Sequence, residues 1–384
     1  MRKNFMNKSA AVIATVLMAV SLTACNGGNT VSGNVSGQEV SVSSIGKQVD
    51  HDTAASTVLM TFEDIDITLE DYYLFMVQYL YNFEIDPATL ASPEAVSNAN
   101  NSILNEIKLE TVEYKLALVE EVTPDPVAIS DADVKAQSFY DYFGQEFFDS
   151  FGISREKVNE LFERQVYIEA LRQKTLTDLA DDYEAEYIDK YGEMKFFQIY
   201  YVLFPSIEYD DDNQPVTTSD GAYVSCNEAK LQEQNKLAEE LREKALENVE
   251  NGEADGNLEE LAIEYGVDFV SGTERGYVGA YSKELNELLE GMENGDISEV
   301  VETEAGYMVV RMDNTDDTEF KDYSIRYMAE QSASSLYTTV QDNWIKESGI
   351  ANAPVDTAAL TDTKIVAMCE YLTGNGLTIN GGNN

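Results

Sequence analysis

The sequence predicts an α+β protein in which a mainly helical lobe, built from both ends of the chain, carries an inserted unit of strands and short helices. Apolar residues at helical spacing, with repeated capping signals, run through residues 57–190. Aromatic and β-branched residues then begin at Lys195, and strand and helix patterns alternate to about residue 313. Residues 320–345 return to a long, aromatic-rich helical pattern that we expect to pack back onto the helical lobe.

Capping signals begin the helical lobe, which we place at residues 56–190. Residues 57–62 read as a short strand, and residues 65–67 as its continuation. Thr68, with Asp71 at the third helical position, forms a variant of the capping box. This signal predicts a helix that reaches about Phe83.

Three more helices follow in the same lobe. A second helix begins at Ser92, which is followed by proline at the first helical position, and it ends before Pro124. Ser130 and an aspartate three residues later predict a third helix that runs towards Phe151. Ser154 caps a fourth helix.

Residues 191–315 have a different pattern, which predicts a small sheet with helices. Residues 195–204 read as a central strand that Pro205 ends, and Asn227 begins an amphipathic helix. The order of the expected elements is β-α-α-β-α-β-β. The later elements are short helices at 258–265 and 284–292 and strands at 276–279, 295–301 and 306–312.

The end of the chain is predicted to contain one long helix and a tail. We assign residues 316–350 to the long helix that packs on the helical lobe. Residues 351–384 form the tail, with a short helix over 363–372 and an end rich in Gly and Asn.

The composition excludes several classes of function. The 384 residues include 71 Asp and Glu against 25 Lys and Arg, a balance that opposes binding to nucleic acid and docking of basic residues on anionic lipid. A hydrophobic fraction of 43% still allows a buried core, so the acidic residues belong to a folded surface. The one histidine, His51, argues against His-based catalytic triads and His-rich metal sites.

Residues 1–24 have the pattern of a secretory signal. Basic residues precede an apolar run over 10–20 that is too short to span a membrane. Residues 22–25, Leu-Thr-Ala-Cys, resemble the bacterial lipobox, in which the cysteine is lipidated and becomes the new N-terminus. We therefore expect a lipoprotein outside the cytoplasm, anchored through Cys25, with a flexible tether over 25–55. The alternative is an ordinary signal in which this cysteine falls by chance.

Neither a disulfide framework nor a metal site is predicted. Cys226 and Cys369 are two free thiols or a single bridge, and the spacing does not favour the bridge. The acidic clusters at 210–212 and 313–317 have oxygen ligands suited to Ca²⁺ but lack the ligand spacing and glycine of an EF-hand loop. We interpret them as solvated acidic loops and predict no cofactor.

Several stretches of the inserted unit resemble motifs of one family. Residues 295–301, Gly-Asp-Ile-Ser-Glu-Val-Val, and residues 306–310, Gly-Tyr-Met-Val-Val, resemble "Gly-acid-Ile-Ser-x-x-Val" and "Gly-Tyr-His-Ile-Ile" of the parvulin-type (PpiC, rotamase) peptidyl-prolyl isomerases. Residues 276–279 resemble the family's "Gly-Asp-Leu-Gly" turn, and residues 201–204 its first strand, "His-Ile-Leu-Val". The resemblance implies an FKBP-like domain over about 195–313.

The layout of the whole chain resembles the PrsA-type lipoprotein foldases and the SurA-type periplasmic chaperones. In those families a helical lobe made from both chain ends carries an inserted parvulin domain. The resemblance implies that unfolded or proline-containing secreted polypeptides are the partners. It implies contact with the membrane through a lipid anchor only.

The same resemblance assigns family-equivalent catalytic positions in which the usual residues are replaced. Family members use two sheet histidines that face a Cys or Asp. The first histidine position falls on Tyr201, or on Tyr200 if the register shifts by one, and the last falls on Met308. Asp268 lies near the Cys/Asp position. Both imidazoles are therefore absent.

The family's apolar substrate pocket maps to Tyr281 and Leu285, and with Tyr200 these are the predicted substrate-binding residues. Structural roles remain open for the other candidates. Tyr201 would be an ordinary strand aromatic, Met308 a sheet core residue and Asp268 an acceptor for a loop amide.

Three functions follow from these observations. The first is a membrane-anchored extracytoplasmic foldase, acting as a chaperone with weak or lost isomerase turnover. The second is a competent prolyl isomerase that uses Tyr201 in place of histidine. The third is a solute-binding or scaffolding lipoprotein, against which the helical start and the single small sheet argue.

Overall fold

The computed structural model describes residues 49–377, apart from 84, 220 and 361–363, and Cys25 lies outside this range. The described residues form two compact units. Unit 1 comprises the described residues up to Thr177 and from Ser335 onward, and unit 2 comprises Asp178–Ser334. Both boundaries fall inside long helices, α6 (Arg155–Tyr191) and α10 (Thr318–Ser348), so each unit contains part of both.

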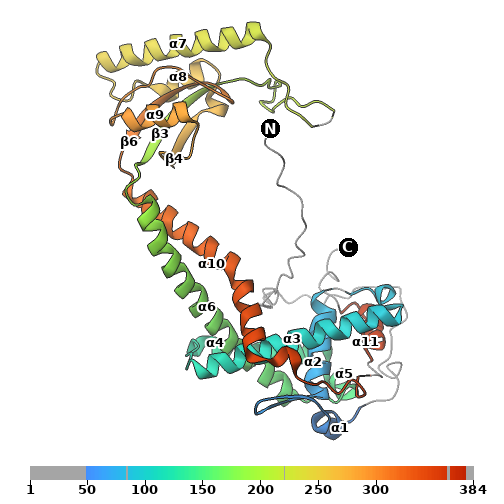
Figure 1. Cartoon of the computed structure of the whole chain (residues 1–384). Helices are drawn as coiled ribbons and strands as arrows, with labels where there is room; N and C mark the ends of the chain where they lie inside the picture. The colour runs from blue at the N-terminus through green and yellow to red at the C-terminus, as the bar shows by residue number, and fades with distance from the viewer. Residues whose placement is uncertain (1–48, 84, 220, 361–363, 378–384) are drawn as a thin grey trace. The chain divides into compact units, whose positions relative to one another are not determined.

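Unit 1 is mainly helical, with one small hairpin (Figure 1). Besides its parts of α6 and α10, its elements are α1 (His51–Ser56), β1 (Val58–Phe62), β2 (Ile65–Thr68), α2 (Leu69–Asn82), η2 (Pro87–Leu90), α3 (Pro93–Val119), α4 (Pro126–Phe143), α5 (Gln145–Ser150), η4 (Ile350–Asn352) and α11 (Ile365–Gly374).

Local capping signals place several of these helices where the sequence predicts them. The Thr68 hydroxyl accepts a hydrogen bond from the backbone N–H of Asp71 at 3.3 Å, and the Asp71 carboxylate accepts one from the backbone N–H of Thr68 at 2.9 Å. This reciprocal pair is the predicted capping box. Ser92 caps α3 in the same way by accepting from the N–H of Ala95.

Two sequence predictions in this unit are wrong. Residues 65–67 do not continue the first strand but fold back on it as β2, with Phe62 opposite Ile65. Glu63, in the left-handed region with φ 53°, allows this reversal of the chain.

The third helix also starts earlier and ends earlier than predicted. It begins at Pro126, because Asp125 accepts a hydrogen bond from the N–H of Val127 and proline suits the first helical position. Ser130 is therefore inside α4. The helix ends at Phe143, because Gly144, with φ 85°, leads into the separate helix α5.

Both chain ends build the core of unit 1, as predicted. Tyr72 of α2 is fully buried and belongs to the same hydrophobic cluster as the α5 residues Phe147 and Phe148. Trp344 of α10 and Met368 of α11 pack against the same cluster. The short helix expected in the tail is α11, and its buried residues complete this core.

A buried polar contact joins α3 to α10 within this unit. The carboxylate of Glu113, which is 4% exposed, accepts hydrogen bonds from Gln341 Nε2 at 2.7 Å and from the Tyr337 hydroxyl at 3.4 Å. Burial raises the pKa of Glu113 to about 7, although both hydrogen bonds act in the opposite direction.

Unit 2 contains an antiparallel sheet in the order β4-β3-β6-β5, which confirms the α+β class and places the predicted strands in one sheet. With its parts of α6 and α10, its elements are β3 (Phe196–Pro205), α7 (Glu228–Glu250), α8 (Leu258–Glu264), η3 (Asp268–Val270), β4 (Gly272–Tyr277), α9 (Lys283–Gly291), β5 (Val301–Thr303) and β6 (Gly306–Asn314).

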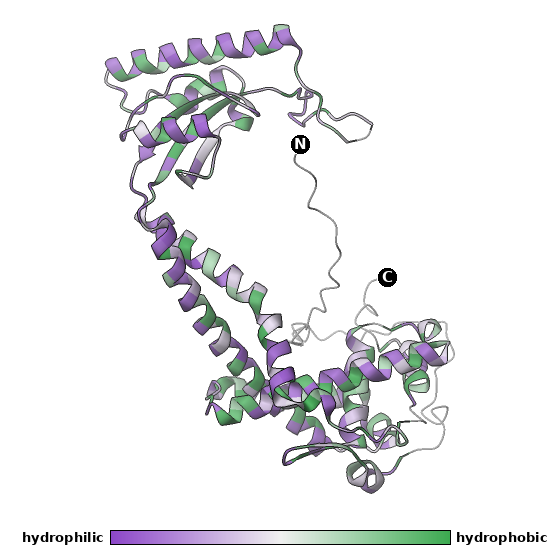
Figure 2. Ribbon diagram, in the orientation of Figure 1, coloured by the Kyte–Doolittle hydropathy of each residue, from purple (hydrophilic) through white to green (hydrophobic). Residues whose placement is uncertain are grey.

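The helices of unit 2 cover opposite faces of this sheet. Buried residues of α7 and α8, such as Leu241 and Leu258, pack on one face with Val202 and Phe204 of β3. Residues of α9, such as Leu289, pack on the other. Figure 2 shows hydrophobic residues at intervals along the otherwise hydrophilic α7, as expected for a helix with one buried side.

The cysteines are as the sequence predicts, whereas two strands have other bounds. Cys226 and Cys369 are both buried free thiols. The strand expected over 295–301 is shorter and later, as β5, and the strand expected over 276–279 starts and ends earlier, as β4. Within the described residues, none of the helices has the length and apolar character needed to cross a membrane.

The raised pKa of Glu113 predicts how the stability of the protein depends on pH. The carboxyl has a pKa of about 7 in the folded chain and about 4.5 when solvated. The stability that its protonated form gives the fold is therefore lost as the pH rises through this interval. At about pH 8, Glu113→Gln should therefore raise the free energy of unfolding by about 3 kcal/mol. At about pH 4 the effect should vanish, because the carboxyl is protonated in both states.

Urea unfolding of the full chain at both pH values measures this effect. Glu94→Gln, at an exposed position near the start of α3, is the matched control and should change little. Equal effects of the two substitutions at about pH 8 would contradict the assignment.

Candidate functional site

The central strand β3 sorts the predicted site residues onto opposite faces of the sheet. Successive side chains of a strand alternate between the faces. Tyr201 therefore lies on the α9 face with Ile199, whereas Tyr200 lies on the face covered by α7 and α8. The register of β6 brings Met308 opposite Leu203, on the same face as Tyr201.

Four of the six predicted positions in the sheet domain share one half-buried apolar cluster. Tyr201, Tyr281, Leu285 and Met308 all belong to the cluster on the α9 face. Leu285 is 6% exposed, while the other three are only partly covered. This arrangement presents apolar surface and aromatic hydroxyls together.

The other two positions lie elsewhere. The guanidinium of Arg311 lies over the ring of Tyr200, 5.5 Å from the ring centroid. Asp268 is exposed at the start of η3, and its charge acts on Tyr200, whose pKa is raised mainly by burial. Neither residue faces Tyr201, so the structure separates them from the apolar cluster.

One functional candidate, Glu274 of β4, was missed by the sequence analysis. Its Oε1 accepts a hydrogen bond from the Tyr281 hydroxyl at 2.7 Å. Glu274 lies opposite Ile199 and therefore on the site face. Because the predicted strand began only at Gly276, the alternation that places Glu274 on this face was not visible.

The loop before α9 holds Tyr281 in place. The side chain of Asn286 accepts a hydrogen bond from the N–H of Gly279 at 2.8 Å and donates one to the carbonyl of Tyr281 at 2.7 Å. Lys195 fixes the other end of α9 by donating to the carbonyl oxygens of Leu289, at 2.9 Å, and Met292, at 2.8 Å. The helix is thus tied to the sheet at both ends.

The hydroxyl groups of this face are protonated donors. Burial raises the pKa of Tyr281, and the hydrogen bond to Glu274 raises it further. Burial also raises the pKa of Tyr201, with a second contribution from the charge of Glu274. Among the described residues the Tyr201 hydroxyl has no hydrogen-bond partner, so it is free to donate to a bound molecule.

This chemistry suits non-covalent binding of a peptide. The site face contains apolar side chains, two phenol donors and one carboxylate, but no cysteine or histidine. Rotation about a peptide bond needs no nucleophile and has a barrier of about 18–20 kcal/mol. A protein lowers such a barrier by holding the residue in an apolar environment and by stabilising the twisted amide. The sheet and its face therefore form a small α+β domain that offers apolar contacts and phenol donors to a bound group.

The comparison with family models identifies this domain. Residues 223–314 match the family described as rotamase, the PPIC-type PPIASE domain. The chain therefore contains a parvulin-type domain, as the motif resemblance implied. The strand β3 precedes the matched residues but lies in the centre of the same sheet.

Solved structures of foldases and chaperones are also similar to the chain. The foldase protein PrsA from Lactococcus lactis is 15% identical, covering 83% of this chain and 98% of that one, with a TM-score of 0.37. PrsA from Streptococcus pneumoniae is 14% identical, covering 83% and 100%, with a TM-score of 0.31. A SurA-like chaperone structure from Campylobacter jejuni is 15% identical, covering 76% and 94%, with a TM-score of 0.21. Among curated proteins, none matches the chain significantly.

The close approach of Gly276 to Tyr281 gives a prediction for this site. A Cβ at Gly276 would collide with the Tyr281 hydroxyl and lie 3.0 Å from its ring. Gly276→Ala should therefore break the hydrogen bond to Glu274 and destabilise the domain by about 1–3 kcal/mol, as overpacking does.

Gly272→Ala is a matched control in the same strand, because a Cβ there meets nothing within 4 Å. Thermal unfolding of both variants measures the difference. Should Gly276→Ala be as stable as Gly272→Ala, Tyr281 would not occupy the described position.

Proposed function

We propose that the protein is a membrane-anchored extracytoplasmic folding factor that binds unfolded secreted polypeptides and has weak or lost prolyl isomerase turnover. The observation that carries this proposal is the match of residues 223–314 to a parvulin-type domain. It is supported by the motif resemblance, which implies that Tyr201 and Met308 stand at the positions of the family histidines. The one histidine of the chain, His51, lies in unit 1 and pairs with Asp149.

Polypeptide binding is supported by the face around Tyr201. Its apolar residues can cover a proline ring, and the phenol donors can satisfy a peptide carbonyl that loses water on binding. Turnover requires more, because the site must bind the twisted amide better than the planar one. With no imidazole in this domain, the face retains the groups for binding but lacks the family's pair of histidines.

The location is supported by the sequence alone. The signal pattern over residues 1–24 and the lipobox-like Leu-Thr-Ala-Cys at 22–25 favour export and lipidation of Cys25. A lipid of this kind would hold the folded units outside the cytoplasm through the tether at 25–55.

An assay of cis-to-trans rotation in a short X-Pro peptide tests the catalytic part of the proposal. The full mature chain should accelerate rotation far less than a parvulin that keeps both histidines. Rotation at the rate of such a parvulin would refute the claim of weak turnover.

Suppression of aggregation tests polypeptide binding directly. A chemically unfolded client diluted into an excess of the protein should stay soluble, and light scattering should fall with increasing protein concentration. Unchanged scattering at large excess would count against the folding-factor function.

A second candidate function is supported by the unpartnered hydroxyl of Tyr201. If this hydroxyl stabilises the twisted amide, Tyr201→Phe should lower any isomerase turnover by about tenfold, the effect of one lost hydrogen bond in the transition state. Peptide affinity should be nearly unchanged, because the ring remains. Tyr200→Phe, on the opposite face, is the matched control and should have full activity.

The two tyrosine variants separate the second function from the first. Equal turnover of the wild type and Tyr201→Phe would exclude a catalytic role for this hydroxyl, while polypeptide binding by the same face would be unaffected.

A further inference from the structure

Unit 1 contains a large pocket that the parvulin-type domain does not explain. It has a volume of about 640 Å³, within the range of about 300–1,000 Å³ that is typical of ligand sites. Its wall is formed by α2, α3, α4 and α6 and the loop before α4. All of its lining residues belong to unit 1.

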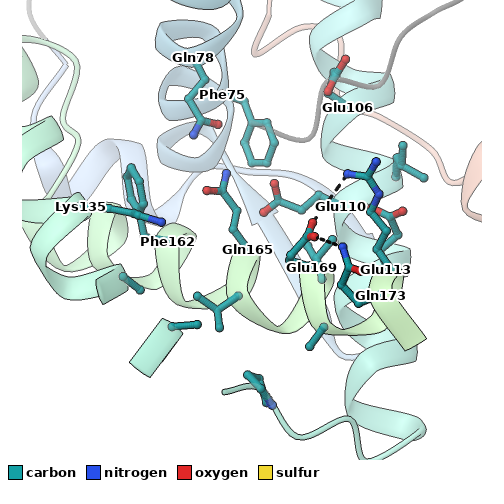
Figure 3. Close-up of a pocket in the computed structure, with 18 of the residues that line it drawn as sticks. Phe75, Gln78, Glu106, Glu110, Glu113, Lys135, Phe162, Gln165, Glu169 and Gln173 are labelled. Carbon is teal, nitrogen blue, oxygen red and sulfur yellow. Dashed lines mark hydrogen bonds and ion pairs between the residues drawn. The ribbon is translucent and has the colours of Figure 1, made fainter. Parts of the chain in front are cut away.

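The wall of the pocket is aromatic and aliphatic on one side. Phe75 of α2 and Phe162 of α6 face the pocket, and Phe162 is only 3% exposed. Figure 3 shows Phe75 and Gln78 of α2 above Gln165 of α6, with Glu110 turned into the space beside them. The pocket can therefore enclose an apolar group and offer it polar contacts at one end.

The charged residues that line the pocket are predominantly acidic. The carboxylates are Asp125, Glu106, Glu110, Glu113 and Glu169, against the two cations Arg172 and Lys135, of which Lys135 lies beside Phe162 in Figure 3. Arg172 is partly engaged, because its Nη1 lies 3.7 Å from Glu169 and its guanidinium lies 5.7 Å from the centre of the Tyr337 ring. Its buried Nε has no hydrogen-bond partner among the described residues. The excess of carboxylates favours a cationic ligand.

Among the pocket carboxylates, Glu110 is the one with a buried oxygen that has no hydrogen-bond partner in the described part of the chain. Its Oε1 is fully buried and accepts no hydrogen bond from the described residues. Glu113, by contrast, already accepts from Gln341 and Tyr337. A buried acceptor left unpaired is costly, so an incoming N–H donor would be stabilised at Glu110 more than elsewhere in the pocket.

We propose that this pocket binds a lysine or arginine side chain together with a neighbouring aromatic or aliphatic residue of an unfolded polypeptide, with the cationic group hydrogen-bonded to Glu110. The apolar stem and neighbour would lie against Phe75 and Phe162. This inference rests on the proposed folding function and names the class of segment that unit 1 selects.

Two features favour a polypeptide over a small free amine. The helices that line the pocket also carry exposed apolar residues outside it, namely Leu118 and Val119 at the end of α3 and Val127, Ile129 and Val134 on α4. These residues offer contacts to chain on either side of the bound residue. The strongly negative net charge of the chain, −46, also attracts basic segments over distance.

The protonation of Glu110 gives the proposal a pH signature. Burial raises the pKa of Glu110 to about 8, an effect that the charges of Asp71, Glu106 and Glu113 reinforce and that of Arg164 opposes. At neutral pH the free pocket therefore holds a proton on Glu110. A bound cation must displace it, so affinity should rise with pH up to about 8 and then level off.

The test uses the full mature chain and two short peptides, one with a central Phe-Lys-Phe and one with norleucine in place of lysine. Isothermal titration calorimetry should show that the lysine peptide binds about tenfold more tightly, the effect of one hydrogen bond to a charged group. Equal affinities for the two peptides would overturn the proposal.

Glu110→Gln keeps the shape of the side chain and removes its charge. The variant should lose about tenfold in affinity for the lysine peptide, keep its affinity for the norleucine peptide and lose the rise of affinity with pH. Glu94→Gln, on the same helix outside the pocket, should bind as the wild type does. Unchanged binding and pH dependence in Glu110→Gln would overturn the proposal.

A second variant blocks the pocket without touching its charges. Ala128 lines the wall at a half-buried position, so Ala128→Trp should fill the space and abolish binding of both peptides. Full binding by this variant would place the peptides elsewhere. If 4-phenylbutylamine binds the wild type and neither peptide does, the pocket belongs to a small amine and the polypeptide is refuted.

These outcomes can be told apart from failure of the folding function itself. If the wild type suppresses aggregation but both pocket variants bind the lysine peptide normally, the pocket inference fails and the folding function stands. If the wild type binds the peptide through Glu110 but leaves aggregation unchanged, the folding function fails and the pocket assignment stands.

Discussion

The alternation of side chains along β3 is the constraint on which unit 2 depends. This strand pairs with β4 on one side and β6 on the other, so its backbone is fixed along both edges. Each residue is thereby committed to one face. Val202 and Phe204 are fully buried under α7 and α8, while Tyr201 is left half-covered beside α9. A shift of one residue would exchange these environments and bury a phenol where the structure holds valine.

Local signals in the sequence decided which parts of the fold could be predicted. A capping box at Thr68, a long apolar strand after Lys195 and a helix start at Asn227 are local signals, and each has the predicted role. The hairpin after Phe62 was missed because the reversal of the chain depends on the left-handed backbone of Glu63, which the sequence does not mark. The start of α4 was missed because Asp125 and Ser130 are both possible N-caps, and Asp125, followed by proline, begins the helix.

The candidate site was less predictable, because its residues meet only through the register of the sheet. The resemblance suggested six positions, and alternation alone separates Tyr200 from Tyr201. Asp268 could not be placed without the path of the chain through η3. Glu274 carries no motif, and its role depends on the hydroxyl of Tyr281, which reaches it across the end of β4. The pocket of unit 1 has no sequence signature at all, since four helices supply its wall.

The two units use acidic groups in opposite ways. In unit 2 the carboxylate of Glu274 accepts from a phenol at a half-buried position and is already satisfied. In unit 1, Glu110 and Glu113 are placed where burial raises the pKa of each, to about 8 and about 7. Burying such groups costs stability, and a helical bundle gains nothing from it when an apolar side chain would fill the same space. Glu113 accepts hydrogen bonds from α10 that offset part of this cost, but Oε1 of Glu110 accepts none, so its place in the wall is best explained by a ligand that supplies the missing donor.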